Sequence, residues 1–189
     1  MGDTWVVISV TTDRDFEPLL AGIREAPRDV GRLELIVRRP AVDKREVLTT
    51  ALLDPTVGLV GDGWLERGST RTADGRANPE SQVTLMSTRA LRAIEPDEAR
   101  WPLAGDQLYV DFDLGQEALP AGSGLAVGSA VLVVSEQPHT GCAKFSARFG
   151  SDALRWINSP DGRELRMRGL NARVVEGGTV RTGDAVRRV

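Results

Sequence analysis

The sequence has only one cysteine and one histidine among its 189 residues. A single cysteine cannot form an internal disulfide, and it cannot build a multi-cysteine zinc or iron–sulfur site by itself. The sequence also lacks an apolar run long enough to cross a bilayer. The apolar residues 5–10 are neither preceded by a basic segment nor followed by a cleavage signal of small residues. We therefore expect a cytoplasmic protein that has no membrane partner.

A large charge of either sign is also missing. The 27 acidic residues nearly balance the 24 lysines and arginines, and the net charge is −3. This balance provides no general attraction for phosphate backbones, so we expect no nucleic-acid partner. The 41% apolar and 27% charged residues are typical of a packed globular protein. The length predicts a single domain over residues 1–189, in which residues 1–32 form a strand–helix extension.

Short segments rich in β-branched residues, separated by glycine and proline, dominate the sequence. We expect strands at residues 5–10, 33–37, 83–86, 108–113, 130–135 and 172–176, followed by C-terminal strands with a hairpin turn at Gly177-Gly178. We expect three helices. The first follows Thr12-Asp13 and has Phe16, Leu19, Leu20 and Ile23 on one side. The second runs from Ser87 to Ile94, and the third runs from a cap at Ser151 to a break at residues 158–162. This pattern predicts a mainly β fold with peripheral α-helices, namely a largely antiparallel, closed or nearly closed barrel.

The sequence Pro138-His139-Thr140-Gly141-Cys142 brings the histidine and the cysteine within three positions of each other, directly after an apolar strand. A cysteine thiolate is a nucleophile and a soft-metal ligand, and His139, Lys144 and Arg148 are the nearby cations that would favour it. Two structural readings stay open. A free cysteine is commonly a small buried apolar residue, and a lone histidine is commonly a hydrogen-bonded turn residue without a catalytic partner.

The segment AVLVVSEQPHTGCAKFSARFG resembles the cysteine segment of the MOSC family, which is named for the C-terminal domain of molybdenum cofactor sulfurase. Other segments resemble the family in the same order: LIVRRP, GLVGDGW, QVTLMS, GDQLYVDFDL, LPAGSGLAVGSAVL, MRGLNARVV and TGDAV. The resemblance covers the chain from about Leu33 onward, and residues 1–32 have no counterpart. It implies a MOSC-type β-barrel in which Cys142 carries sulfur or coordinates molybdenum through the molybdenum cofactor.

The resemblance also implies site residues. Cys142 and His139 would be catalytic, and Arg168, Lys144, Asp62, Asn78 and Gln82 would bind the cofactor. Arg168-Gly169 resembles an RG element of the family and is the first choice for a phosphate ligand, ahead of Arg38 and Arg45, because an arginine fork matches an anion well. Some relatives carry a histidine in a GD-x-H element, whereas this chain has Trp64 there. No pyridoxal-phosphate site is identifiable.

Three functions are consistent with these residues. The first is a molybdenum-dependent enzyme that reduces N-hydroxylated compounds with electrons from a separate reductase or ferredoxin. The second is a sulfur carrier in which a Cys142 persulfide, loaded by a cysteine desulfurase, serves cofactor maturation. The third is a cofactor-free interaction module. We further expect the long loop at residues 55–79, which is rich in glycine and small polar residues, to border the cavity that contains Cys142.

Overall fold

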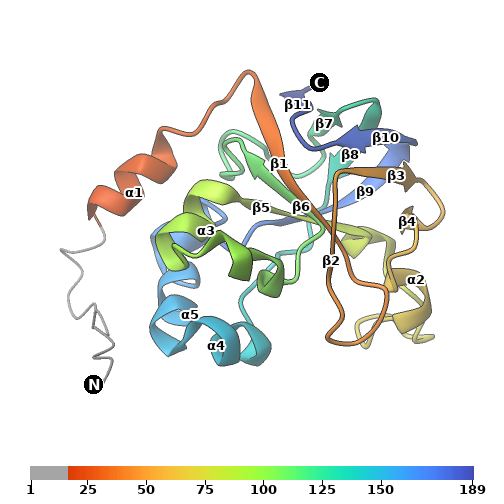
Figure 1. The fold of residues 1–189 in the computed structure, drawn as a ribbon, viewed down its shortest axis with the longest axis horizontal. Coiled ribbons are helices and arrows are strands. Elements are labelled where there is room, and N and C mark those ends of the chain that lie inside the picture. Colours follow the sequence, from red (N-terminus) through yellow and green to blue (C-terminus); the bar gives the residue numbers. More distant parts are fainter. Residues whose placement is uncertain (1–16) are drawn as a thin grey trace, which may run out of the picture.

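A seven-stranded β-barrel with peripheral helices forms the centre of the protein (Figure 1). The structure is a computed structural model and describes residues 17–189. The barrel strands, in their order around the barrel, are β11 (Ala185–Arg188), β7 (Gly124–Val127), β8 (Ala130–Val134), β9 (Leu170–Glu176), β5 (Val83–Ser87), β6 (Leu108–Asp111) and β1 (Gly31–Arg38). The barrel closes because β1 pairs with β11, while the short strand β2 (Glu46–Leu48) pairs with the other end of β1.

Every strand pairing within residues 17–189 is antiparallel except the pairing of β5 with β6. Parallel neighbours cannot be joined by a tight turn, and the chain between β5 and β6 forms α3 (Thr88–Ile94) and the 3₁₀ helix η3 (Glu98–Ala104). The prediction of a largely antiparallel barrel is confirmed. The predicted strands at residues 108–113, 130–135 and 172–176 are also confirmed, with ends that differ by one or two residues.

The protein has two hydrophobic cores, and successive side chains of a barrel strand point alternately into one core and the other. On β6, Leu108 and Val110 point into the barrel, while Tyr109 lies in the second core, between the sheet and the helices. A β-bulge between Leu33 and Leu35 shifts the alternation on β1. As a result Leu33 and Ile36 belong to the barrel core, which a simple alternation does not predict.

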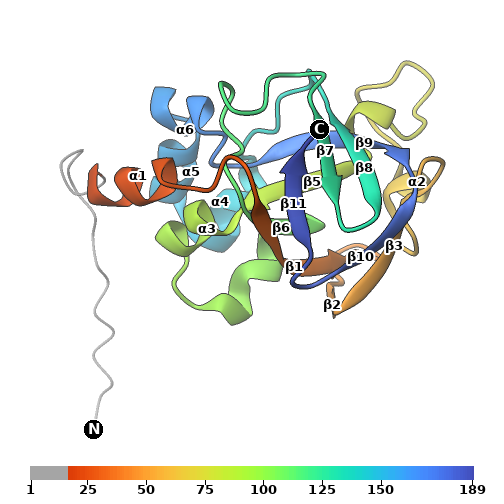
Figure 2. The ribbon, with the colours of Figure 1, turned by 90° about the horizontal axis from the view of Figure 1, so that it is seen from above.

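Most of the helices gather on one flank of the barrel, and a small second sheet lies on the opposite flank (Figure 2). The helical flank contains α1 (Glu17–Arg24), α3, α4 (Ala143–Phe149), α5 (Ser151–Ile157) and α6 (Pro160–Glu164). The second sheet contains β3 (Thr50–Asp54), β4 (Gly58–Leu59) and β10 (Gly178–Arg181), next to α2 (Trp64–Arg67). The 3₁₀ helix η2 (Pro79–Ser81) precedes β5. No helix within residues 17–189 is both long and apolar enough to cross a membrane.

Two local predictions are wrong. Gly177-Gly178 is not a hairpin turn, because β10 pairs with β3 and not with β9. A Cβ on Gly178 would lie 2.4 Å from the Ser129 carbonyl oxygen, so this glycine permits a close approach of two backbones. Ser151 is the first residue of α5, whose cap is Gly150, and the expected break after α5 is short because α6 begins at Pro160.

The expected first strand at residues 5–10, the cap at Thr12-Asp13 and Phe16 lie outside the described residues. The helix expected after them is present as α1, which begins at Glu17. Leu20 and Ile23 of α1 are buried in the core between the helices and the sheet, whereas Leu19 is exposed.

Candidate functional site

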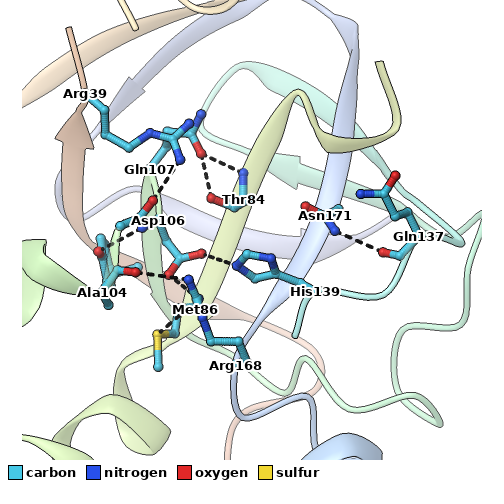
Figure 3. A network of polar contacts seen from close by, with 12 residues as sticks. Arg39, Thr84, Met86, Ala104, Asp106, Gln107, Gln137, His139, Arg168 and Asn171 are labelled. Carbon is cyan, nitrogen blue, oxygen red and sulfur yellow. Dashed lines mark hydrogen bonds and ion pairs between the residues drawn. The ribbon is translucent and has the colours of Figure 1, made fainter. Parts of the chain in front are cut away.

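A buried carboxylate, Asp106, joins three segments of the chain on the helical side of the barrel. Asp106 lies two residues before β6 and is fully buried. Its Oδ2 accepts a hydrogen bond from Nη1 of Arg168 at 2.5 Å, and its Oδ1 lies 2.9 Å from Nε2 of His139. Figure 3 shows His139 and Arg168 reaching the Asp106 carboxylate from different sides. Asp106 is therefore the centre of an Arg–Asp–His network.

The position of Arg168 depends on the glycine that follows it. Gly169 has φ +94°, and a Cβ at this position would lie 1.9 Å from the carbonyl oxygen of Leu85. Only glycine allows the chain to pass so close to β5 in this conformation. Arg168 is thereby held against the outer face of the sheet, where its guanidinium lies 5.2 Å from the centre of the Phe145 ring of α4.

The network keeps Asp106 ionised and His139 neutral. Burial alone would raise the pKa of Asp106, but the charge of Arg168 and the contacts with His139 outweigh burial and lower this pKa to about 2. Burial lowers the pKa of His139, and the charge of Arg168 lowers it further, against a smaller opposing effect of Asp106. Because an ionised carboxylate only accepts hydrogen bonds, Nε2 of His139 carries the ring proton and Nδ1 is an acceptor.

Neighbouring groups satisfy most of the remaining hydrogen bonds of the network. Arg168 donates from Nη2 to the Ala104 carbonyl at 3.0 Å, while its buried Nε has no partner among the described residues. The Tyr109 hydroxyl accepts from the Asp106 backbone N–H at 3.2 Å and donates to the Trp101 carbonyl at 3.1 Å. Burial raises the pKa of Tyr109, so this hydroxyl stays protonated and acts as a fixed donor.

His139 and Arg168 also line a cavity of about 400 Å³ between the β8–α4 loop and the ends of α5 and α6. Cys142 does not line this cavity, although it follows His139 by three residues. No residue between 55 and 79 lines it either, and within residues 17–189 the only hydrogen bond from that loop to the cavity wall is the one that Asn78 donates to Gln137. The structure therefore does not support the expectation that Cys142 and the loop share this cavity.

Cys142 is an exposed free thiol at the N-terminal end of α4. Its backbone is extended, and its carbonyl accepts the Ser146 N–H at 3.0 Å, which begins the helix. Lys144 of α4 is exposed as well. The reading of Cys142 as a buried packing residue is wrong, since solvent reaches the residue.

A second group of cations lies beside the network, on the other side of Gly105. Arg39 forms a buried, two-pronged ion pair with Asp62, with distances of 2.9 Å and 3.0 Å, and it donates to the Gly105 carbonyl at 2.7 Å. Asp62 also accepts the backbone N–H groups of Arg39 and Trp64. The expectation that Asp62 orients a cation therefore agrees with this geometry.

Arg45 belongs to the same group of cations but has no carboxylate partner within residues 17–189. Its Nη1 donates to the Lys44 carbonyl, and its Nε is buried without a partner in the part of the chain that the structure describes. Burial lowers the pKa of Arg45, and the charges of Arg148 and Arg39 lower it further. A Cβ on Gly105 would lie 3.7 Å from Arg45 and 3.8 Å from Arg148, so both guanidinium groups meet at this glycine. We refer to Arg39, Arg45 and Arg148 as the arginine cluster.

The remaining predicted site residues make structural contacts. Gln82 is buried and bridges two backbone segments, because its Oε1 accepts from the Val174 N–H at 2.8 Å and its Nε2 donates to the Pro55 carbonyl at 2.9 Å. Asn78 caps η2 and donates to Gln137. Arg38 pairs with Glu46 at the exposed start of β2.

Asp106 and Arg39 are the two site residues that the sequence did not single out. Asp106 follows a glycine just before a strand, and this Gly-Asp pair occurs elsewhere in the sequence as ordinary turn chemistry. Arg39 adjoins a proline at the end of a strand, and its partner Asp62 is 23 positions away. Only the tertiary fold brings these pairs together.

Comparisons with known proteins agree with the barrel. A family model described as MOSC domain matches residues 72–187. The YUAD protein from Bacillus subtilis superimposes with a TM-score of 0.60 at 17% identity, over 84% of this chain and 95% of that chain. YiiM from Escherichia coli has a TM-score of 0.54 at 20% identity, over 84% and 69% of the two chains. YiiM from Geobacillus stearothermophilus has a TM-score of 0.56 at 13% identity, over 84% and 75%. No curated protein matches the sequence significantly.

Proposed function

The chain belongs to the MOSC domain family, and from this premise we propose that it binds the molybdenum cofactor with Cys142 as the protein ligand of molybdenum. The observation that carries the proposal is Arg45, a partly buried cation with no carboxylate partner within residues 17–189. It meets Arg148 of α4, the helix that the exposed free thiol of Cys142 precedes. A soft thiolate suits a metal–sulfur centre. Within residues 17–189 no group of three or more His, Cys, Asp or Glu side chains could hold a metal ion, so most metal ligands would belong to the cofactor itself.

The donors of the arginine cluster fit the phosphate of this cofactor. Arg45 has an orphaned buried Nε and a pKa lowered by burial and by its cationic neighbours, and an anion would relieve both conditions. Arg148 is held in place by the Leu103 carbonyl and the exposed Asp43, which leaves its guanidinium beside Arg45. Arg168 is a poorer candidate, because Asp106 already neutralises its charge.

The proposed reaction is the reduction of an N-hydroxylated compound. Two electrons and two protons convert R–NH–OH to R–NH₂ and water, with cleavage of the N–O bond. When bound, the cofactor supplies a metal that changes oxidation state, and a separate reductase or ferredoxin supplies the electrons. In this proposal His139 would relay a proton: its neutral ring, oriented by Asp106, takes up a proton from solvent at Nδ1 and gives it to the leaving hydroxyl group.

The test is the molybdenum and pterin content of the full chain after expression in cells that make the cofactor. We expect stoichiometric molybdenum in the wild type and its loss in Cys142→Ser. Arg45→Gln should weaken retention about tenfold, because a charge-assisted hydrogen bond contributes about 1.5–3 kcal/mol. Arg155→Gln is the matched control, since within residues 17–189 this exposed arginine pairs only with Asp152 of the same helix. A wild type without molybdenum, or a Cys142→Ser variant that loads normally, would refute the proposal.

A second function, sulfur transfer, is favoured by the exposure of Cys142. In this case the Cys142 thiolate attacks the terminal sulfur of a persulfide on a cysteine desulfurase. A new S–S bond forms on Cys142, the S–S bond of the donor breaks, and the donor cysteine leaves as a thiolate, so no external oxidant is needed. Intact-mass measurement after incubation with a desulfurase and cysteine would detect the added sulfur atom, which Cys142→Ser should not acquire.

A further inference from the structure

We propose that the cavity beside His139 binds a small monoanionic hydroxycarboxylic acid. This inference goes beyond the proposed function and does not depend on the cofactor. At about 400 Å³, the cavity falls at the small end of the range typical of ligand pockets, about 300–1,000 Å³. Apolar walls from Ile157 and Leu170 are combined with polar and charged groups on the other sides.

The charges that line the cavity leave one net positive charge. Arg163, Arg166 and Arg168 line the cavity, and Glu136 is the only acidic residue in its wall. Asp106, which lies behind the wall, cancels the charge of Arg168 through their buried ion pair. His139 is neutral. Two arginines then face one glutamate, which favours a ligand with a single negative charge over a dianion such as phosphate.

Several hydrogen-bond donors in the wall have no partner within the part of the chain that the structure describes. The guanidinium of Arg163 forms no ion pair or hydrogen bond there. Arg166 uses only Nη1, which donates to the Leu114 and Leu119 carbonyls at 3.3 Å and 2.5 Å. Asn158 accepts the Gly141 N–H through Oδ1, so its amide N–H groups remain available. Planar arginine forks beside an amide donor are a suitable environment for a carboxylate.

The backbone and the burial of Arg166 also indicate a ligand. Arg166 has φ +45°, a left-handed conformation that is uncommon for a residue other than glycine and is concentrated at functional sites. Partial burial lowers the pKa of Arg166. A bound carboxylate would compensate the partly desolvated cation.

His139 accounts for the hydroxyl group of the proposed ligand. Its Nε2 donates to Asp106, and its Nδ1 has no partner within residues 17–189. The imidazole ring lines the cavity. A neutral histidine whose free nitrogen is an acceptor selects a ligand with an O–H donor, and His139 lines the same cavity as the arginines that would bind the carboxylate.

The experiment is isothermal titration of the cofactor-free full chain with lactate, 2-hydroxyisocaproate and mandelate. Three further compounds serve as comparison probes. Phenylacetate lacks the hydroxyl of mandelate, mandelamide lacks its charge, and inorganic phosphate is a smaller anion of higher charge. We expect saturable one-site binding of at least one hydroxy acid. If mandelate is among the binders, phenylacetate should bind about tenfold more weakly, and mandelamide and phosphate should bind weakest.

Arg163→Gln should weaken binding of the hydroxy acid at least about tenfold, whereas Arg155→Gln should bind like the wild type. The inference is overturned if none of the three hydroxy acids binds, if phosphate or mandelamide binds as tightly as the best acid, or if Arg163→Gln binds unchanged. The molybdenum content of Arg163→Gln separates the two proposals. Normal loading with lost acid binding supports a separate site, and loss of loading would instead assign Arg163 to the cofactor.

Discussion

Nε2 of His139 lies 2.9 Å from Oδ1 of Asp106, although the two residues are 33 positions apart in the sequence. The carboxylate fixes the orientation of the imidazole ring and holds its proton on Nε2. Arg168 bonds to the other carboxylate oxygen and balances its charge. The result is a neutral, oriented histidine at the wall of a cavity, which is the arrangement needed for proton transfer or for recognition of a hydroxyl group.

The lowered pKa of His139 predicts that stability falls in mild acid. The unfolded chain takes up a proton near the usual histidine pKa of about 6.5, whereas the folded chain binds it only at lower pH. The free energy of unfolding should therefore decrease as the pH falls from 7 to 5, where no other histidine of this chain titrates. Urea denaturation at several pH values measures this slope. His139→Gln should flatten it, and equal slopes for both proteins would contradict the burial of a neutral histidine.

Removing the charge of Asp106 should lower the stability of the folded protein strongly. Asp106→Asn leaves the Arg168 guanidinium buried without its counter-ion, and we expect a loss of about 3–5 kcal/mol of unfolding free energy. The exposed pair of Asp161 with Arg24 is the matched control, so Asp161→Asn should change stability by less than about 1 kcal/mol. Urea or thermal denaturation gives both values. A loss for Asp106→Asn as small as that of the control would show that the buried pair is dispensable.

Alanine substitutions at Gly169 and Gly122 distinguish the stability cost of steric overlap from the stability cost of backbone strain. Both have positive φ, but a Cβ on Gly169 would lie 1.9 Å from the Leu85 carbonyl oxygen, whereas a Cβ on Gly122 meets nothing within 4 Å. We expect Gly122→Ala to cost about 1 kcal/mol from strain alone and Gly169→Ala to cost about 3 kcal/mol or more. Equal losses in chemical denaturation would mean that the close approach at β5 is unimportant.

The exposure of Cys142 predicts ready alkylation of the native protein. Iodoacetamide should modify the folded chain at a rate similar to that of the urea-unfolded chain at the same pH, because Cys142 is exposed to solvent in the fold. Mass spectrometry over time gives the two rates. Protection by a hundredfold or more in the folded state would show that Cys142 is shielded.

The strands were predictable because their alternation and their glycine and proline boundaries are local features of the sequence. The partner of each strand was not equally predictable. Gly177-Gly178 has the composition of a hairpin turn, yet β10 pairs with β3, which lies far away in the sequence. The bulge in β1 likewise depends on its pairing with β6 and not on the residues of β1 alone.

The candidate site was predictable only in part. The sequence singled out Cys142, His139 and Arg168 because unusual residue types occur in family-like segments. It did not single out Asp106, which determines the protonation of His139 and neutralises Arg168. Aspartate after glycine is common in turns, so its burial and its two partners become evident only when β6, β9 and the β8–α4 loop are assembled.

X-ray absorption at the molybdenum edge, recorded on the purified wild type and on Cys142→Ser, shows whether the Cys142 sulfur is a ligand of molybdenum. We predict that the wild type contains molybdenum with one more sulfur ligand than any residual molybdenum in the variant, because the Cys142 thiolate binds the metal. Identical sulfur coordination in the two proteins, at equal molybdenum content, would contradict the assignment of Cys142 as the molybdenum ligand.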